Sequence, residues 1–212
     1  AIIGLGTLGS NEMQFRSDLD LIFIYENKKN IKESNGINKL PTSKYFARLS
    51  QQFISAITSL TSEGRIFEID MRLRPSGNSG PIATSIESFE QYHDSSSWTW
   101  EKMALTRAKP IAGDKMIIDK INLLLKKILS KQIPQEILLN DILSMRERIK
   151  KQYNRDKWQI KNSPGGLLDI QFLAQYLQLL YSSNHTDILD QKIKNIFINL
   201  KERNLLNSDI AD

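Results

Sequence analysis

The stretch that decides the fold of this chain reads GLGTLGSNEMQFRSDLDLIFIY and covers residues 4–25. Two glycines, Gly6 and Gly9, end an apolar segment that begins at the first residue, and this pattern predicts a short strand followed by a turn. The end of the stretch is rich in Leu, Ile and Phe, which predicts a second strand. The acidic residues Asp18 and Asp20 open that second strand, soon after the glycine turn.

Three carboxylates are candidates for a metal site. Asp18 and Asp20 share one face of their strand, because strand side chains alternate between two faces. A further strand is predicted over residues 65–74, where apolar and charged residues alternate and Asp70 lies on the polar face. An isolated Asp-x-Asp pair is more often a solvated strand end, but the preceding turn and the third acid favour two metal ions held by Asp18, Asp20 and Asp70. Crowding of these catalytic acids is expected to raise at least one pKa.

Gly9 and Ser10 are the candidates for binding phosphate. Glycine lets the backbone approach a phosphate closely, and residues 11–15 could start a short helix whose N–H groups bind anions. A tight turn that needs only glycine is the alternative. Arg72 and Arg74, on the polar face of the third predicted strand, form ion pairs with the acids or hold a triphosphate. We predict that Gly9, Ser10, Arg72 and Arg74 bind the nucleotide.

The glycines also fit the dinucleotide-binding pattern G-x-G-x-x-G through Gly4, Gly6 and Gly9. This interpretation is rejected because the ribose-binding acid of that fold stands about 20 residues beyond the turn. Asp18 follows far too early for that role.

The rest of the chain divides into a mixed part and a helical part. Residues 27–43 are polar and predict a loop, and apolar residues then recur at helical spacing over 42–61. The string TSIE at 84–87 has the pattern of a capping box that opens a helix. Beyond residue 112 every apolar pattern has the helical period. We therefore predict the α+β class, with a catalytic lobe over residues 1–112 and an all-helical lobe over 113–212.

The composition is that of an ordinary globular protein, with 40% hydrophobic and 25% charged residues. Cysteine is absent, which excludes disulfides and thiolate metal sites. No apolar stretch approaches the roughly 18–20 residues needed to cross a bilayer, and no signal peptide is visible, so we expect a cytoplasmic protein. The net charge of +5 suits an anionic partner, but ordinary surface charge is the favoured explanation. The basic residues between Arg146 and Lys161 are expected on a solvated helix face. Because the chain opens inside a predicted strand without Met, we expect a fragment of a longer protein.

Several motifs together resemble the glutamine synthetase adenylyltransferase family, within the nucleotidyltransferase superfamily that includes DNA polymerase beta. They are GLGTLGS at 4–10, SDLDL at 17–21, DMRLRPSG at 70–77, WTWE at 98–101, ALTRA at 104–108 and GGLLDIQF at 165–172. The resemblance implies a polymerase beta-like nucleotidyltransferase lobe followed by helices. It also implies a bifunctional enzyme with two similar halves, one attaching AMP from ATP to a tyrosine of glutamine synthetase and one removing it by phosphorolysis. The WTWE string resembles the adenylylating, C-terminal half.

The same resemblance implies ATP as substrate, two Mg²⁺ ions, glutamine synthetase as protein substrate, and a role in nitrogen metabolism. A regulatory signalling protein is expected to act through segments outside this chain; a membrane or a nucleic acid is not expected as a partner. The chain has Thr7 where the family often has Lys, and Gln171 where it usually has Glu. Asp169 matches the family motif, but a favourable charge at a helix N-terminus explains it. Two rival functions are nucleotidyl transfer to another acceptor, such as a small molecule or an RNA end, and a binding module without activity.

Overall fold

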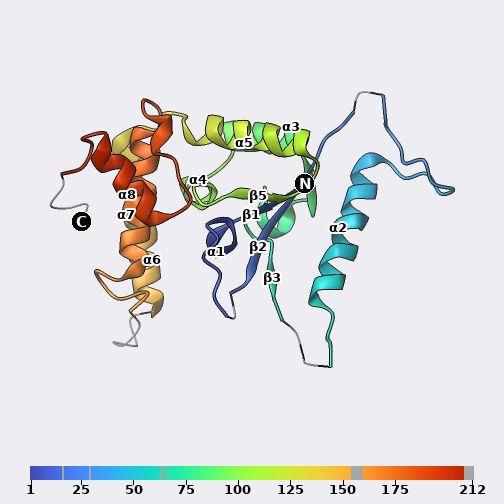
Figure 1. The fold of residues 1–212 in the computed structure, drawn as a ribbon, viewed down its shortest axis with the longest axis horizontal. Coiled ribbons are helices and arrows are strands. Elements are labelled where there is room, and N and C mark those ends of the chain that lie inside the picture. Colours follow the sequence, from blue (N-terminus) through green and yellow to red (C-terminus); the bar gives the residue numbers. More distant parts are fainter. Residues whose placement is uncertain (16, 29, 63, 65, 154–159, 208–212) are drawn as a thin grey trace. The chain divides into compact units, whose positions relative to one another are not determined.

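The structure is a computed structural model of the 212-residue chain (Figure 1) that describes residues 1–15, 17–28, 30–62, 64, 66–153 and 160–207. Packing divides the chain into two compact units. Unit 1 comprises Ala1–Ser97 and Ala108–Leu125, and unit 2 comprises Trp98–Arg107 and Lys126–Asp212. These units differ from the ranges 1–112 and 113–212, which stay a prediction about the functional division of the chain.

Unit 1 is built on a mixed sheet with the strand order β3-β2-β1-β5, in which β4 also pairs with β2. The strands are β1 Ile2–Gly4, β2 Leu19–Tyr25, β3 Ile69–Asp70, β4 Ala83–Ser85 and β5 Lys109–Ala112. β1 is antiparallel to β2 and β5, and β2 is parallel to β3 and β4. The first two predicted strands are confirmed. The sequence pattern missed β4 and β5, because three or four residues are too few to show a period.

The strand predicted over residues 65–74 is wrong in extent, since only Ile69 and Asp70 pair as β3; Arg65 lies outside the described residues. The Asp70 side chain is the physical reason for the early end. Its Oδ1 accepts a hydrogen bond from the backbone N–H of Arg72 at 2.8 Å, which offers the backbone a turn in place of a strand ladder. The backbone N–H of Arg74 then donates to the carbonyl of Met71 at 3.2 Å. The chain therefore turns directly after Asp70.

Unit 1 also contains helices, of which α1, α2 and α3 contact the strands of the sheet. They are α1 Gly6–Gly9, α2 Thr42–Thr58, α3 Ile86–Ser95, a short 3₁₀ helix Gly77–Ser79, and the first part of α5, Lys115–Leu129. The predicted amphipathic helix is confirmed as α2, whose Phe46 ring stacks on Tyr25 at 4.8 Å. Phe53 meets Phe23 edge-on at 5.6 Å. The residue that caps α3 is Ser85, not Thr84 as the TSIE pattern predicts, because Ser85 Oγ accepts the Ser88 N–H at 3.2 Å.

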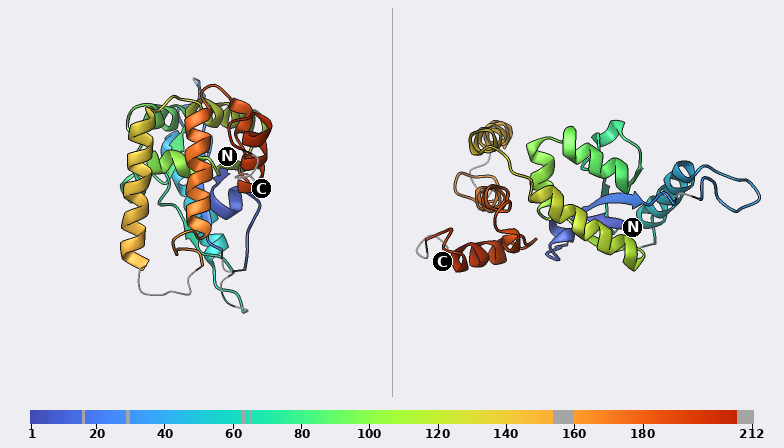
Figure 2. Two further views of the ribbon diagram at one scale, coloured as in Figure 1. Left: turned by 90° about the vertical axis from the view of Figure 1, so that its left-hand side faces the viewer. Right: turned by 90° about the horizontal axis from the view of Figure 1, so that it is seen from above.

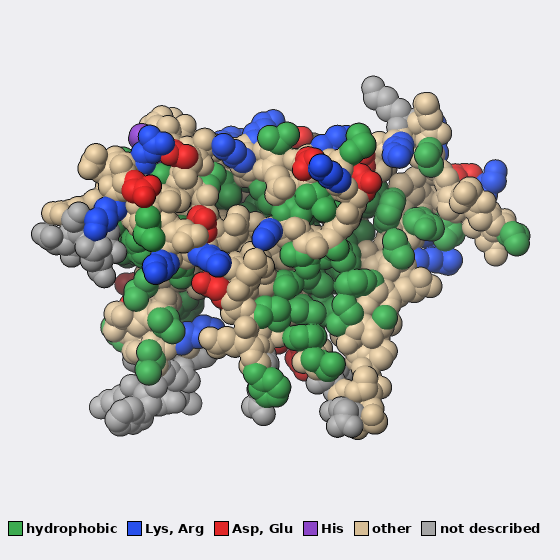
Figure 3. Space-filling view, viewed as in Figure 1, with side chains coloured by type: hydrophobic (Ala, Val, Ile, Leu, Met, Phe, Trp, Pro, Cys, Tyr) green, Lys and Arg blue, Asp and Glu red, His purple; other side chains and the backbone are tan. Residues whose placement is uncertain are grey.

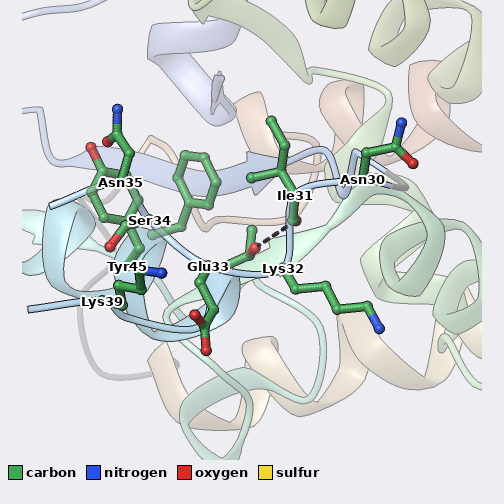
Figure 4. A pocket seen from close by; sticks show the side chains of 10 residues that line it. Asn30, Ile31, Lys32, Glu33, Ser34, Asn35, Lys39 and Tyr45 are labelled. Atoms are coloured by element: carbon green, nitrogen blue, oxygen red, sulfur yellow. Dashed lines mark hydrogen bonds between the residues drawn. The ribbon is translucent and has the colours of Figure 1, made fainter.

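The predicted loop between β2 and α2 folds back on itself. The backbone N–H of Ser34 donates to the carbonyl of Leu40 at 2.9 Å, and an isolated antiparallel bridge joins Glu33 to Pro41. This short hairpin and the start of α2 line an open hollow of about 1210 Å³ (Figure 4). Across it, the Thr42 hydroxyl donates to the Ile31 carbonyl at 3.3 Å.

Unit 2 is a bundle of helices, which confirms the helical character predicted for the later part of the chain. It contains α4 Thr99–Leu105, the last turn of α5, α6 Gln135–Tyr153, α7 Leu167–Tyr181, a 3₁₀ helix Thr186–Ile188 and α8 Ile193–Glu202. Figure 2 shows α6 and α7 as neighbouring helices. The hydrophobic core of unit 2 includes a cluster formed by Ala174, Leu177, Ile188, Ile196 and Leu200.

Buried polar groups on α7 and at its C-cap, Ser182, join the helices of the bundle. The Gln175 amide donates to the carbonyl of Met103 in α4 at 3.0 Å, and the Ser182 hydroxyl donates to the carbonyl of Leu129 at 2.6 Å. Helix α4 therefore belongs by packing with helices that follow it in the sequence. Figure 3 shows hydrophobic side chains gathered on one face of unit 1 near α2. In the described part of the chain, no helix has both the length and the apolar character needed to cross a bilayer.

Candidate active site

The first element of the candidate site is the turn from β1 into α1. The Leu5 N–H donates to the Asp20 carbonyl at 3.0 Å, which holds the turn against the start of β2. Gly6 has a φ of 55°, in the left-handed region that L residues rarely adopt. A Cβ at this position would stand 2.5 Å from Oδ2 of Asp20. The Asp20 carboxylate therefore lies directly over the start of α1.

The second element is the pairing of β2 with β3. These strands are parallel, with Leu19 opposite Ile69 and Asp20 opposite Asp70. Adjacent strands are about 4.8 Å apart, so the register brings the two half-buried acids side by side. Asp18 is exposed and lies just before β2 begins. The structure thus pairs two of the three predicted acids and places the third at the approach to the strand.

The third element is Arg72, which binds Asp70 across the turn. Arg72 Nε donates to both Asp70 oxygens, at 3.0 Å to Oδ1 and 2.8 Å to Oδ2, and its Nη2 also donates to Oδ2. These side-chain hydrogen bonds lower the pKa of Asp70, the opposite direction to the one expected for a crowded acid. The pKa of Arg72 is raised, first by Asp70 and more weakly by Asp20 and Asp18. All three carboxylates therefore act on one guanidinium.

Arg74 has a different environment from the one that strand alternation predicts. Its Nη1 donates to the Met71 carbonyl at 2.8 Å, its Nε to the Gly80 carbonyl at 3.3 Å and its Nη2 to the Asn78 carbonyl at 3.3 Å. The guanidinium thus braces the loop that follows Asp70. In this conformation Arg74 supports the loop, and a phosphate contact would require its donors to be shared.

The predicted phosphate-binding residues lie at the end of α1. The Ser10 side chain is 2% exposed, and its hydroxyl donates to the Gly6 carbonyl at 3.1 Å. The Gly9 N–H donates to the Leu5 carbonyl at 3.0 Å. Both groups stabilise the turn in this conformation, so direct phosphate binding by them stays a prediction that needs the turn to open.

The donor set around Asp20 and Asp70 suits a hard divalent cation by its chemistry, because carboxylate oxygens are the ligands that Mg²⁺ prefers. Three acids also act on a single cationic group, the Arg72 side chain. Among the residues that the structure describes, however, no group of three or more acidic, His or Cys side chains is gathered closely enough to hold a metal ion. Both oxygens of Asp70 accept hydrogen bonds from Arg72 in this conformation.

Comparisons with known proteins show the family of this chain. Residues 1–122 match the family model described as glutamate-ammonia ligase adenylyltransferase. The chain belongs to the glutamate-ammonia ligase adenylyltransferase family. The matched range contains every predicted site residue, and residues 140–211 in the helical part match the model for GlnD PII-uridylyltransferase.

Curated relatives of this family carry the name bifunctional glutamine synthetase adenylyltransferase/adenylyl-removing enzyme. The chain is 45% identical over 182 residues to the one from Brucella melitensis, covering 84% of this chain and 18% of the relative. For Bradyrhizobium diazoefficiens the identity is 43% over 191 residues, covering 90% and 19%. The chain therefore spans about a fifth of the length of these relatives.

Two side-chain contacts in unit 2 involve residues of the motifs ALTRA at 104–108 and GGLLDIQF at 165–172. The sequence patterns did not predict either contact. Arg146, predicted on a solvated helix face, is partly buried and forms an ion pair with Asp169, and its Nη2 donates to the Asn162 carbonyl at 3.1 Å. The buried Arg107 donates to Oε1 of Gln171 at 3.3 Å. Both pairs join residues far apart in sequence, so no local pattern could have identified them.

Proposed function

We propose that this chain is the nucleotidyl-transferring part of a glutamine synthetase adenylyltransferase, with unit 1 containing a polymerase beta-like catalytic lobe. The observation that carries the proposal is the position of Asp20, which lies over the glycine turn at Gly6 and opposite Asp70 in the sheet. An acidic pair beside a glycine turn can place a divalent cation next to a triphosphate. Family membership and the name of the curated relatives support the same activity.

In the proposed reaction the acceptor tyrosine oxygen bonds to the α-phosphorus of ATP. The bond from that phosphorus to the oxygen bridging the α- and β-phosphates breaks, and pyrophosphate leaves with that oxygen. Asp18, Asp20 and Asp70 would hold Mg²⁺, which supplies charge neutralisation and lowers the pKa of the attacking hydroxyl. Asp70 is proposed to help accept the tyrosine proton.

The remaining site residues are proposed to position the nucleotide. Gly9 and Ser10 would hold the β- and γ-phosphates at the turn, and the Arg72 side chain, 75% exposed, would reach a phosphate after releasing Asp70. Arg74 would act from the loop that it braces. Positioning and charge neutralisation carry most of the acceleration in such transfers.

We assign the adding direction to this chain, because its WTWE string at 98–101 resembles the adenylylating half of the family. The names of the curated relatives include both the adding and the removing activity, so the removing direction is the alternative. Transfer to an acceptor other than glutamine synthetase is a further alternative that shares the same site. A regulatory signalling protein, two Mg²⁺ ions and a cytoplasmic location belong to the same proposal.

The test gives the chain unmodified glutamine synthetase with Mg²⁺ and ATP labelled in its α-phosphate, and separately adenylylated glutamine synthetase with Mg²⁺ and phosphate. We expect label on glutamine synthetase and slower release of ADP in the second reaction. Faster release of ADP would reverse the direction. If a full-length relative performs both reactions and this chain performs neither, the proposal that this chain carries the nucleotidyl-transferring activity is wrong.

A further inference from the structure

Three N–H groups of Arg72 take up most of the acceptor capacity of the Asp70 carboxylate, and the single Nε–H is shared between its two oxygens. A carboxylate offers about four lone-pair positions. Oδ1 accepts the Arg72 backbone N–H at 2.8 Å and Nε at 3.0 Å, and Oδ2 accepts Nε at 2.8 Å and Nη2. A cation that needs an Asp70 oxygen must therefore displace at least part of this bonding.

The two partners differ in how firmly they are held. The Asp70 side chain is 18% exposed and is fixed opposite Asp20 by the register of β2 and β3. The Arg72 side chain is 75% exposed and stands in the turn beyond β3. Ion pairs with one exposed partner are weak, so the arginine is the group that can leave.

The phosphate groups of a nucleotide are a second anionic partner for Arg72. A guanidinium binds phosphate through two parallel N–H bonds, with better geometry than a lysine. In the proposed reaction a triphosphate comes to the same acids, and Arg72 is already bonded to Asp70, which lies opposite Asp20 in the sheet. A triphosphate arriving there offers Arg72 a doubly charged partner in exchange for Asp70.

We infer that Arg72 and a divalent cation compete for the oxygens of Asp70, and that a nucleoside triphosphate promotes metal binding by drawing Arg72 away from Asp70. This inference rests on the proposed function, because it assumes that the acids hold a metal beside a triphosphate. Binding of the two ligands is then cooperative in both directions, as linkage requires. Arg72 acts as a positioning residue that keeps the metal site closed until the nucleotide is bound.

The experiment measures free Mn²⁺ by electron paramagnetic resonance in titrations of the 212-residue chain, with and without a non-hydrolysable ATP analogue. Arg72→Met removes the competing charge and keeps a side chain of similar reach, and Arg48→Met, at an exposed position on α2, is the matched control. We expect Arg72→Met to bind Mn²⁺ about tenfold more tightly without nucleotide, because one adjacent positive charge is removed. The analogue should tighten Mn²⁺ binding to the wild-type and Arg48→Met chains much more than to Arg72→Met, after correction for Mn²⁺ bound by the free analogue.

The outcomes separate the inference from the proposed function. Mn²⁺ binding that Asp70→Asn weakens, but that Arg72→Met fails to tighten, would overturn the competition and leave the metal site intact. Mn²⁺ binding that Asp20→Asn and Asp70→Asn leave unchanged would overturn the metal site and the competition together. Circular dichroism of each variant shows whether it has kept the wild-type fold, and Arg72→Lys, which keeps the charge but loses the paired N–H donors, should bind Mn²⁺ with intermediate affinity.

Discussion

The Asp20 carboxylate occupies the space that a side chain at Gly6 would need. Oδ2 of Asp20 is 2.5 Å from the position of a Cβ on Gly6, whose φ of 55° also disfavours any other L residue. The glycine thus serves two purposes, since it permits the backbone turn and leaves room for the acid. The glycine turn and the acid on β2 therefore depend on each other, because any side chain at Gly6 would displace the Asp20 carboxylate.

Gly6→Ala is expected to destabilise the chain by about 1–3 kcal/mol, because alanine is strained at a positive φ and its Cβ displaces the Asp20 carboxylate. Urea denaturation followed by circular dichroism gives this value. Gly36→Ala is the matched control, since a Cβ there meets nothing within 4 Å, and it should change stability by less than about 0.5 kcal/mol. Equal effects of the two substitutions would contradict the role assigned to Gly6.

Asp20→Asn and Asp70→Asn are each expected to reduce AMP transfer about 100-fold or more, because each removes a charge that stabilises the transition state by several kcal/mol. Asp18→Asn should also abolish most of the transfer while leaving the chain folded, since Asp18 is exposed. Initial rates with labelled ATP test all three. Glu33→Gln, an exposed acid in the hairpin after β2, should keep the wild-type rate. Near-full activity of Asp20→Asn would refute the site.

Asp169→Asn is expected to destabilise unit 2 at neutral pH by about 1–3 kcal/mol, the usual loss for a hydrogen bond to a charged group. Asp169 pairs with Arg146 and accepts the Gly165 N–H at 2.7 Å, and these bonds lower its pKa. Because the folded pKa is below the unfolded one, this stabilisation is full above the unfolded pKa of about 3.9 and is lost as pH falls through the folded pKa.

The measurement is the free energy of unfolding from pH 7 down to pH 2 for both chains. The difference between wild type and Asp169→Asn should shrink below about pH 4 as the wild-type acid is protonated. Asp119→Asn, at an exposed position on α5, provides the control and should follow the wild-type curve closely. A difference that stays constant across this range would show that the ion pair is not its source.

Gln171→Glu is expected to stabilise unit 2 by about 1 kcal/mol, because a charged acceptor strengthens the hydrogen bond from Arg107. Arg107 is 8% exposed and donates to Gln171 Oε1 at 3.3 Å. The urea midpoint should rise for Gln171→Glu and fall for Gln171→Leu, which removes the acceptor. A lower midpoint for Gln171→Glu would mean that desolvating the new charge outweighs its pairing.

Local patterns in the sequence were sufficient for much of this structure. The apolar run before Gly6 and the Leu- and Ile-rich run after Asp18 predicted β1 and β2, because alternation and short apolar runs are properties of neighbouring residues. The helical period predicted α2 and the helices of the later part of the chain in the same way. The candidate acids were chosen from their spacing together with the preceding glycine turn and the third acid, and the structure places Asp20 on β2 and Asp18 just before it.

The tertiary structure decided what depends on residues far apart in the chain. The sequence could not show that Asp70 would end its own strand by bonding Arg72, or that α4 would pack with α7 through Gln175. The short strands β4 and β5 exist because neighbouring strands supply their hydrogen bonds, and the ion pair of Arg146 with Asp169 forms because packing brings α6 to α7. Spacing along the chain determines which side chains share a face, but only register and packing determine which charges meet.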